Sequence, residues 1–431
     1  MAVGRLKKDK VTTSGNTAAR PSNPEIGDTF YNGVLASLEI YDGSKWIPAS
    51  RDWTISDYPP QTPTIGTATA SSTALEATVT WTLGSNGGKA LSAITITPYL
   101  NGTTAGTPQN AATTSSTSHT FTGLADSSTY TFKVKATNAN GDSAESIATN
   151  SITTVALLTV DYLVVAGGGG GGSHNSAGGG AGGMRSTVTN TGGGGTLESA
   201  IGIAKGTNHT VTVGSGGAGG GTNAAGSSGA NSVFATITST GGGGGGGSSG
   251  GAGQSGGSGG GGSVSGAVGA RTASPVQGFA GGAGGSNLGG GGGGAGQVGG
   301  AANSGTGIAG NGGDGLACSI TGSSVTYAGG GGGSADSASV GNQGTGGAGG
   351  GAAGKQNTTS NATANTGGGG GAENRIIATP GAGGSGIVIL RWLTSAGTIT
   401  VGAGLTADST GTDGSYSYKR FTAGSGNVSF A

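Results

Sequence analysis

The sequence predicts an all-β protein with a large glycine-rich part, and three observations support this. Short β-branched and aromatic segments alternate with turn residues over the first 154 residues, a pattern typical of hairpins and β-sandwiches. Most of the 106 glycines lie between about Gly167 and Gly386. Apolar, strand-like segments at 160–166 and 386–392 flank that stretch, and a flexible linker would not need them. We therefore expect an N-terminal β-hairpin module, a β-sandwich, and a polyglycine-II helical bundle anchored on a small β-sheet.

The composition argues against catalysis and against nucleic-acid binding. The 431 residues carry 18 basic and 18 acidic side chains, and the formal net charge is zero. No stripe of Lys and Arg is therefore present to neutralise phosphates. One cysteine and three scattered histidines provide almost no raw material for a metal site or a nucleophile. We expect no enzyme activity, no cofactor and no metal.

The sequence also contains no segment that suggests a membrane protein. No apolar run approaches the roughly 20 residues of a membrane span, and Met1 to Arg5 does not begin a signal peptide. We therefore expect the chain to fold in a cytosol. Cys318 lies beside strand-like sequence and is expected to be a small buried residue rather than a nucleophile.

Residues 1–58 are predicted to form a polar arm followed by a small attachment module. The arm carries Lys7, Lys8 and Lys10, which we interpret as a solvated charge run. Short aromatic and apolar strands separated by turn residues follow in 20–32 and 38–48, as in a hairpin. The pattern PSNPEIGDTFYN…LEIYDGSKW resembles short β modules of bacteriophage tail and fibre proteins. That resemblance implies attachment to other virion proteins through the N-terminal region.

Residues 59–154 are predicted to form an antiparallel β-sandwich, because about seven short strands fit into fewer than 100 residues. The stretch GLADSSTYTFKVKATNANGDS, together with Trp81 in an early strand, resembles the fibronectin type III family. The resemblance places Tyr130 at the tyrosine corner of that family, where the hydroxyl binds backbone upstream. We expect this domain to be a spacer. Its predicted core and corner residues are Trp81, Leu124, Tyr130, Phe132 and Val134.

Residues 155–396 are predicted to form the glycine-rich domain. A glycine run has no side chain to bury and loses much backbone entropy on folding, so it folds only if its backbone groups pair with other backbone. The polyproline-II conformation permits this, since it has three residues per turn and all its amides and carbonyls point outward. Non-glycine residues are then expected mainly on the outer face. Turns are expected at 173–176, 286–288, 301–304 and 355–360.

Strand-like segments interrupt the glycine runs and are expected to complete the small sheet. They lie at 210–213, 232–238 and 319–327, and we expect them to join 160–165 and 386–393. Residues 397–431 are expected to complete the glycine-rich domain with a C-terminal hairpin made from 416–421 and 427–430.

The pattern DYLVVAGGGGGGS…GGGGAGG…TVTVGSGGAG…GGSGIVILRW resembles the glycine-rich domains of phage tail-fibre adhesins. It is also similar to the glycine-rich domain of the anaplastic lymphoma kinase receptor. The resemblance implies a polyglycine-II bundle whose variable loops contact a host cell-surface receptor, on a protein made in the host cytoplasm and carried on the virion surface. The resemblance also implies a homotrimer, since phage fibres are usually trimeric, and no heptad pattern in this sequence enforces one.

Two loops are the predicted receptor-binding regions of such an adhesin. The first, 263–279, contains Arg271, Val276 and Phe279, and the second, 372–378, contains Asn374, Arg375, Ile376 and Ile377. Exposed apolar residues on a polar surface favour a contact patch, whereas the alternative is that Phe279 and the isoleucines cap the glycine segments. Two other functions stay open: a non-adhesive virion decoration or fibre subunit, and an ice-binding or extracellular matrix protein.

Overall fold

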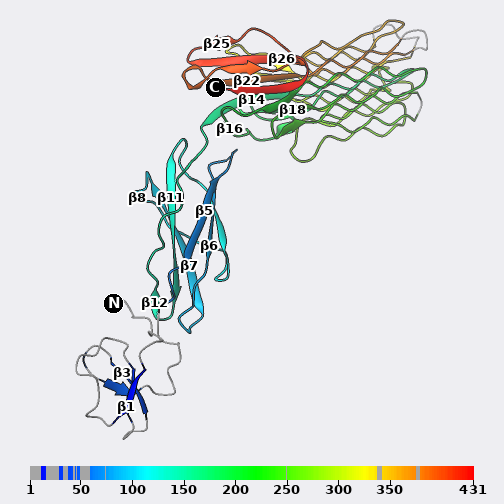
Figure 1. The fold of residues 1–431 in the computed structure, drawn as a ribbon. Helices are drawn as coiled ribbons and strands as arrows, with labels where there is room; N and C mark the ends of the chain where they lie inside the picture. Colours follow the sequence, from blue (N-terminus) through cyan, green and yellow to red (C-terminus); the bar gives the residue numbers. More distant parts are fainter. Residues whose placement is uncertain are drawn as a thin grey trace. The chain divides into compact units, whose positions relative to one another are not determined.

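A computed structural model describes residues 11–15, 29–32, 37–41, 44, 46–48 and 59–431, except 73, 249, 337–341 and 375–378. The chain divides into two compact units, Met1–Val155 and Ala156–Ala431, both drawn in Figure 1. In the described ranges the elements are β-strands and two short 3-10 turns, without an α-helix, so the all-β prediction is confirmed. Within these same ranges, no helix has the length and apolarity to cross a membrane.

The first unit begins with a four-stranded sheet in the order β1-β2-β3-β4. Strands β2 and β3 pair antiparallel, as do β3 and β4, which confirms the predicted hairpin pattern. Strand β1 pairs parallel with β2, and that pairing was not predicted. Residues Lys7, Lys8 and Lys10 lie outside the described residues. The strands are β1 (Val11–Gly15), β2 (Thr29–Asn32), β3 (Ser37–Tyr41) and β4 (Trp46–Pro48).

A β-sandwich follows, with one three-stranded and one six-stranded sheet. The longest pairing joins β7 and β11 antiparallel, from Leu91 opposite Asn138 to Leu100 opposite Tyr130. The first sheet contains β5 (Thr64–Ala70), β6 (Ala77–Thr82) and β10 (Ser118–Phe121). The second contains β7 (Leu91–Leu100), β8 (Thr104–Ala105), β9 (Gln109–Asn110), β11 (Thr129–Asn138), β12 (Gly141–Asp142) and β13 (Ile152–Thr153).

The predicted core of the sandwich is confirmed. Side chains of β11 alternate between buried and partly exposed positions, as expected for a strand with one face on the core. The Tyr130 hydroxyl accepts a hydrogen bond of 3.1 Å from the amide of Ala125, so the chain forms the tyrosine corner that the resemblance implied. The predicted core residues Trp81, Leu124, Tyr130, Phe132 and Val134 are all buried.

The second unit is built on an 11-stranded sheet. Its central pair is β14 with β22, antiparallel from Asp161 opposite Arg391 to Val165 opposite Ile387. The path of the sheet runs β15-β14-β22-β26-β17-β18-β19. These strands are β14 (Leu157–Val165), β15 (Met184–Ser186), β17 (His209–Thr212), β18 (Ser232–Phe234), β19 (Ile237–Ser239), β22 (Ile387–Leu393) and β26 (Tyr416–Phe430). Four short strands pair beside this path: β16 (Ile201–Ala204), β23 (Ile399–Val401), β24 (Leu405–Ala407) and β25 (Gly411–Asp413).

The second half of β14, residues 162–165, is buried on both faces, which explains its continuous apolar sequence. Val160, Tyr162 and Val164 belong to one hydrophobic cluster, while Leu163 and Val165 belong to another on the opposite face. The predicted anchoring sheet is therefore present, and the flanking segments of the glycine-rich stretch form its centre.

Two details of the predicted sheet were wrong. The segment 319–327 does not join it: β20 (Leu316–Cys318) and β21 (Val325–Tyr327) form a separate two-stranded sheet. Residues 416–430 form one long strand instead of a hairpin. This strand pairs with β22 through its first half and with β17 through its second half, so both halves gain partners without reversing the chain. Cys318 is buried, as predicted.

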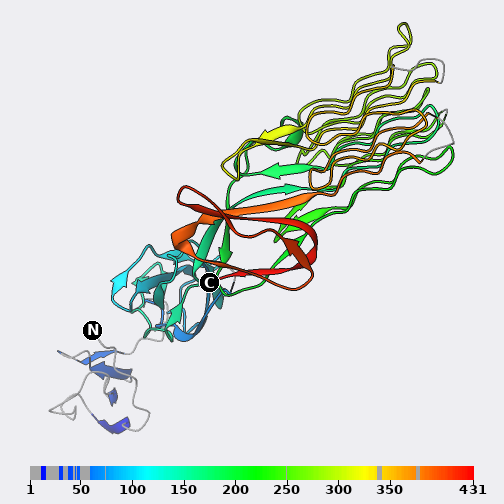
Figure 2. The same ribbon diagram turned by 90° about the horizontal axis from the view of Figure 1, so that it is seen from above.

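The glycine runs extend away from one side of this sheet as many side-by-side segments (Figures 1 and 2). Those described are assigned to neither helix nor strand, apart from the short 3-10 turn Gly192–Gly194, so the element assignment alone does not establish a polyglycine-II helix. The hydrogen bonds of the run 167–172 nevertheless have a period of three. Its six amides donate in rotation to three segments, reaching Ala230, Gly384, Gly180, Ser227, Gly381 and Ala177 in that order.

The carbonyl groups of the same run pair with three further segments. They accept, from residue 167 to residue 172, from the amides of Gly242, Gly217, Gly370, Gly245, Gly220 and Glu373. This run thus has six neighbouring segments, and the run 289–294 has six as well. Both are buried along their whole length. All of these partners belong to the same chain, so the glycine segments pack within one molecule.

The interior runs require glycine because of close backbone approach. None of residues 167–172 has a positive φ, so an unusual torsion angle is not the reason. A Cβ atom on Gly168 would overlap with the carbonyl oxygen of Gly368, and one on Gly170 would overlap with that of Ala218. The prediction that non-glycine residues lie mainly outside is met by exposed Ala267, Ala283 and Ala301, although some alanines, such as Ala177, are buried.

Candidate functional site

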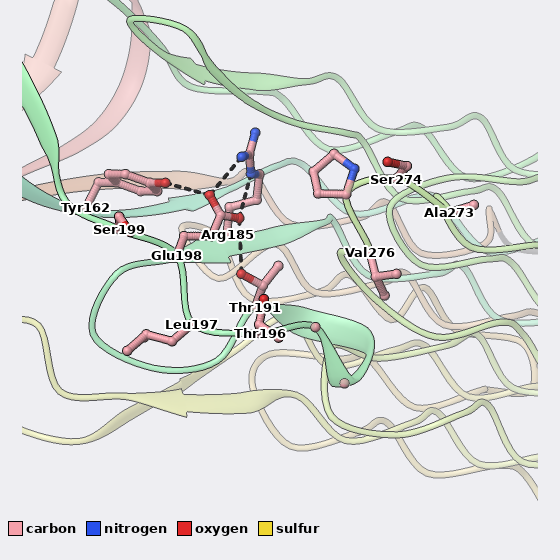
Figure 3. Close-up of a pocket in the computed structure, with 13 residues that line it drawn as sticks. Tyr162, Arg185, Thr191, Thr196, Leu197, Glu198, Ser199, Ala273, Ser274 and Val276 are labelled. Carbon is pink, nitrogen blue, oxygen red and sulfur yellow. Dashed lines mark hydrogen bonds and ion pairs between the residues drawn. The ribbon is translucent and has the colours of Figure 1, made fainter.

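A cleft with a volume of about 750 Å³ lies where the glycine segments meet the sheet. One wall is the loop 189–199 between β15 and β16, and the other is the loop 273–276 (Figure 3). Its size falls in the range of small-molecule sites, roughly 300 to 1,000 Å³. We therefore treat this cleft as the candidate functional site.

Glycine shapes the wall formed by 189–199. The 3-10 turn Gly192–Gly194 has positive φ angles of 75° at Gly193 and 76° at Gly194, a conformation that favours glycine. The Thr191 amide donates to the carbonyl of Thr196 at 3.3 Å, which closes the loop. The Arg271 guanidinium donates to the carbonyl of Gly193 at 2.7 Å. The loop is thereby tied to the neighbouring glycine segment.

The opposite wall is held by a buried amide side chain. Gln277 is 2% exposed, and its side-chain oxygen accepts from the amide of Thr240 at 2.7 Å. Its carbonyl accepts from the amide of Met184 in β15 at 3.0 Å. These contacts place the adjacent Val276 at the edge of the cleft.

Three side chains converge on the carboxylate of Glu198 at the base of the cleft (Figure 3). The Arg185 guanidinium donates to both carboxylate oxygens, at 2.8 Å through Nε and 2.7 Å through Nη2. The Tyr162 hydroxyl donates at 2.5 Å and the Thr191 hydroxyl at 3.1 Å. Such a bidentate, charge-assisted arrangement is among the stronger protein hydrogen bonds.

The electrostatics of this cluster favour the ionised carboxylate. Burial by itself would raise the pKa of Glu198, but the hydrogen bonds from Arg185 and Tyr162 and the Arg185 charge outweigh it, so the pKa is lowered. Burial raises the pKa of Tyr162 far above its ordinary value, and the hydrogen bond to Glu198 adds to this. At neutral pH the cluster is therefore an ion pair plus a neutral phenol.

The Glu198 carboxylate is fully engaged within the protein. The carboxylate accepts four hydrogen bonds within the protein, so it is already occupied and is not placed to act as a general base. Thr196, Ser199 and Ser274, which carry hydroxyl groups, line the cleft. Leu197 adds an apolar side chain that is 54% exposed. Among the described residues, no group of three or more His, Cys, Asp or Glu side chains is placed to hold a metal ion.

The structure brings together three of the predicted contact residues. Arg271, Val276 and Phe279 all lie around the turn Gly192–Gly194: Arg271 bonds Gly193, and a Cβ on Gly193 would overlap with a methyl group of Val276. The Arg271 guanidinium lies over the Phe279 ring, 5.7 Å from its centroid. Val276 lines the cleft itself.

Asn374, from the second predicted loop, lies at the opposite end of the glycine segments. Asn374 is 3% exposed, and its side-chain nitrogen donates to the carbonyl of Ala335 at 2.7 Å. It follows a run that starts beside the sheet at Gly367. The amide of the preceding residue, Glu373, donates to the carbonyl of Gly172, at the far end of the run 167–172. Six extended residues, or roughly 19 Å, separate that end from the sheet. Asn374 is thus a buried turn residue, not part of one patch with Val276. Arg375, Ile376 and Ile377 lie outside the described residues.

No sequence motif marks Tyr162, Arg185 and Glu198, which line the base of the cleft. Tyr162 and Arg185 lie on β14 and β15, which pair antiparallel, while Glu198 lies on a loop. One signal was present: Arg185 and Glu198 are among the few charged residues between 160 and 390, where a glycine lattice gives no reason for charge.

Two family models match the chain. A family model of the glycine-rich domain matches residues 143–393, and one of the fibronectin type III domain matches residues 59–152. A search of curated proteins finds no match.

Two solved structures show local similarity. Domains of titin are 24% identical, with 22% of this chain and 32% of that chain covered and a TM-score of 0.18. The FN1–FN3 domains of chicken CNTN1 are 15% identical, with 30% of this chain and 57% of that chain covered and a TM-score of 0.20. The alignments thus span less than two thirds of either structure.

Proposed function

We propose, from the premise that the chain belongs to the glycine-rich domain family, that it is a non-enzymatic virion fibre or receptor-binding protein. In this proposal the N-terminal region attaches to other virion proteins, the fibronectin type III domain acts as a spacer, and the glycine-rich domain presents loops to a host cell-surface receptor. The observation that supports it best is the lattice of glycine segments, which holds many turns together at the end remote from the sheet.

We further propose that these segments are polyglycine-II helices. The rotation of amide donors among three neighbours has the period of three residues per turn that this conformation has. The burial of the whole run 167–172 between six segments supports the same interpretation. Circular dichroism of the isolated glycine-rich domain tests it: a left-handed polyproline-II spectrum is expected beyond the strand contribution, and its absence contradicts the proposal.

The adhesive role is tested on virions that carry this protein. Electron cryomicroscopy is expected to place the glycine-rich domain outward, and purified protein is expected to compete with virions for host cells. A variant in which the exposed turn 303–306 is replaced by glycine and serine should compete less well. Density for the glycine-rich domain against the particle would contradict the proposal. Outward density without competition would favour the alternative of a non-adhesive decoration or fibre subunit.

The cleft beside the sheet supports a second recognition role. Its charged side chains neutralise one another, and its remaining polar side chains carry hydroxyl groups, so it fits a neutral, hydroxyl-rich ligand such as a saccharide unit. The apolar surface of Leu197 and Val276 would contact the carbon-bound hydrogens of the ring. Saturation-transfer NMR with a panel of free monosaccharides tests this, with Leu197→Asp as the blocking variant and Leu393→Asp as an exposed control. Equal signals for both variants, or none with the unmodified protein, would contradict it.

A further inference from the structure

A two-point backbone contact recurs at the outer segments of the glycine lattice. In each case the side-chain oxygen of one residue accepts a hydrogen bond from the backbone amide of a partner residue on the neighbouring segment. The residue that follows the first one in sequence then donates its own backbone amide to the carbonyl of the same partner residue. We call this pair of bonds a side-chain clamp. It occurs at Ser255, Asn311, Asp314 and Asn361, whose partners are Ala270, Thr345, Ala348 and Ala382.

The clamps at Asn311 and Asp314 lie one three-residue turn apart. Asn311 Oδ1 accepts from the Thr345 amide at 2.9 Å, while Gly312 donates to the Thr345 carbonyl at 2.8 Å. Asp314 Oδ1 accepts from the Ala348 amide at 2.8 Å, while Gly315 donates to the Ala348 carbonyl at 2.8 Å. Both distances in each clamp are those of well-formed hydrogen bonds.

At this position side-chain oxygens take the place of backbone carbonyls as hydrogen-bond acceptors. Along 344–348, the amides of Gly344 and Gly347 donate to carbonyls of the interior run, at Gly333 and Gly330. The amides of Thr345 and Ala348, each one residue further along the segment than Gly344 and Gly347, donate to side-chain oxygens instead. The backbone carbonyls of Asn311 and Asp314 are not available there.

Those carbonyls are engaged on the other side of their segment. The Asn311 carbonyl accepts from Gly300, and the Asp314 carbonyl accepts from Gly296 and Gln297. Asn311 and Asp314 are both exposed, so each clamp sits on the outer surface and is reached by solvent. The side chain therefore satisfies a donor that otherwise faces outward.

We propose that the side-chain clamps mark the boundary of the glycine lattice and keep a second copy of the chain from docking on it. An outward row of backbone donors with a period of three would match the carbonyl rows of another glycine segment, just as an open edge strand matches another strand. The clamps occupy those donors and cover them with polar side chains. The negative charge of Asp314 adds repulsion between two copies that approach through this face.

The experiment compares the full chain with the double variant Asn311→Ala/Asp314→Ala. Hydrogen exchange at Thr345 and Ala348 is expected to become roughly tenfold faster, because each amide loses its acceptor. Exchange at Gly344 and Gly347, which donate to the interior run, is expected to stay slow and also shows that the variant is folded. Light scattering is expected to show masses above that of the unmodified protein, rising with concentration.

Two further variants are the controls. Asn311→Asp keeps an acceptor oxygen and is expected to leave exchange at Thr345 and the molecular mass unchanged. Gln297→Ala removes an exposed polar side chain from the adjacent segment without touching a clamp, and it should resemble the unmodified protein. Unchanged exchange at Thr345 and Ala348 in the double variant would overturn the clamp. Faster exchange without any rise in mass would overturn its boundary role.

Discussion

At the scale of single residues, glycine in the interior of the lattice acts through its missing Cβ atom. Gly170 is buried, and a Cβ atom there would overlap with the carbonyl oxygen of Ala218. Gly221 is exposed and has no heavy atom within 4 Å of the same position. Neither residue has a positive φ, so the two positions differ in the space available for a methyl group.

Gly170→Ala is therefore expected to lower the free energy of unfolding by about 3 kcal/mol, because backbone must move to admit the methyl group. Gly221→Ala should change it by no more than about 1 kcal/mol, and a small increase is expected from the reduced entropy of the unfolded chain. Urea unfolding of the two variants measures the difference. Equal effects would show that the interior tolerates a side chain.

Glu198 gives a prediction with a defined pH dependence. Its pKa is lowered in the folded protein, so the carboxylate contributes stability above its unfolded pKa of about 4.3, and that contribution is lost as the pH falls through the folded value. Glu198→Gln is expected to lower the free energy of unfolding by about 2 kcal/mol at pH 7, through loss of the charge-assisted bonds. The difference between the two proteins should shrink below about pH 4. A difference that stays constant down to pH 3 would contradict this.

At the scale of elements, the anchoring sheet depends on strand β14. Leu163 is 0% exposed and lies in the cluster that also contains Met184 and Ile389, whereas Leu393 at the end of β22 is 45% exposed. Leu163→Ala is expected to cost about 2 to 5 kcal/mol, and Leu393→Ala less than about 1 kcal/mol. Thermal unfolding of both variants checks this contrast. Similar decreases in the unfolding temperature would mean that β14 is not central to stability.

Local sequence patterns predicted most strands but not their long-range partners. Alternating β-branched and aromatic residues located β6, β7 and β11, and the tyrosine corner at Tyr130 followed from a local motif. Strand β26 was split in prediction because Ala423, Gly424 and Gly426 interrupt its apolar pattern, yet pairing with β22 and β17 keeps it continuous. The pairing with neighbouring strands therefore determines the extent of β26, which local residue preferences do not predict.

The candidate site was predictable only in part for the same reason. Val276, Arg271 and Phe279 stood out as bulky residues among glycines, and they do lie beside the cleft. Asn374 also stood out, but each glycine run reverses the direction of the chain, so the number of runs before a loop decides at which end it lies. Glu198 and Arg185 come together through a strand pairing and a loop closure that no short motif marks.

At the scale of the whole molecule, the two compact units have separate cores. The cluster around Phe132 and Val79 lies in the first unit, and the clusters around β14 lie in the second. Phe132→Ala is expected to destabilise the sandwich by about 3 to 5 kcal/mol and leave the second unit unaffected. Calorimetry with hydrogen exchange checks this. The unfolding temperature of the sandwich should fall while that of the second unit stays the same, and an equal fall in both would show that the units unfold together.

The six-neighbour packing of the interior runs has a mechanical consequence. A β-sheet is hydrogen-bonded in one plane and bends more readily across it. The run 167–172 is bonded to neighbours all around its axis, so a sideways load is shared by hydrogen bonds whichever way it is applied. We therefore expect the lattice to resist bending to a similar degree in every transverse direction and to hold its turns at a constant spacing when the far end is pulled or sheared.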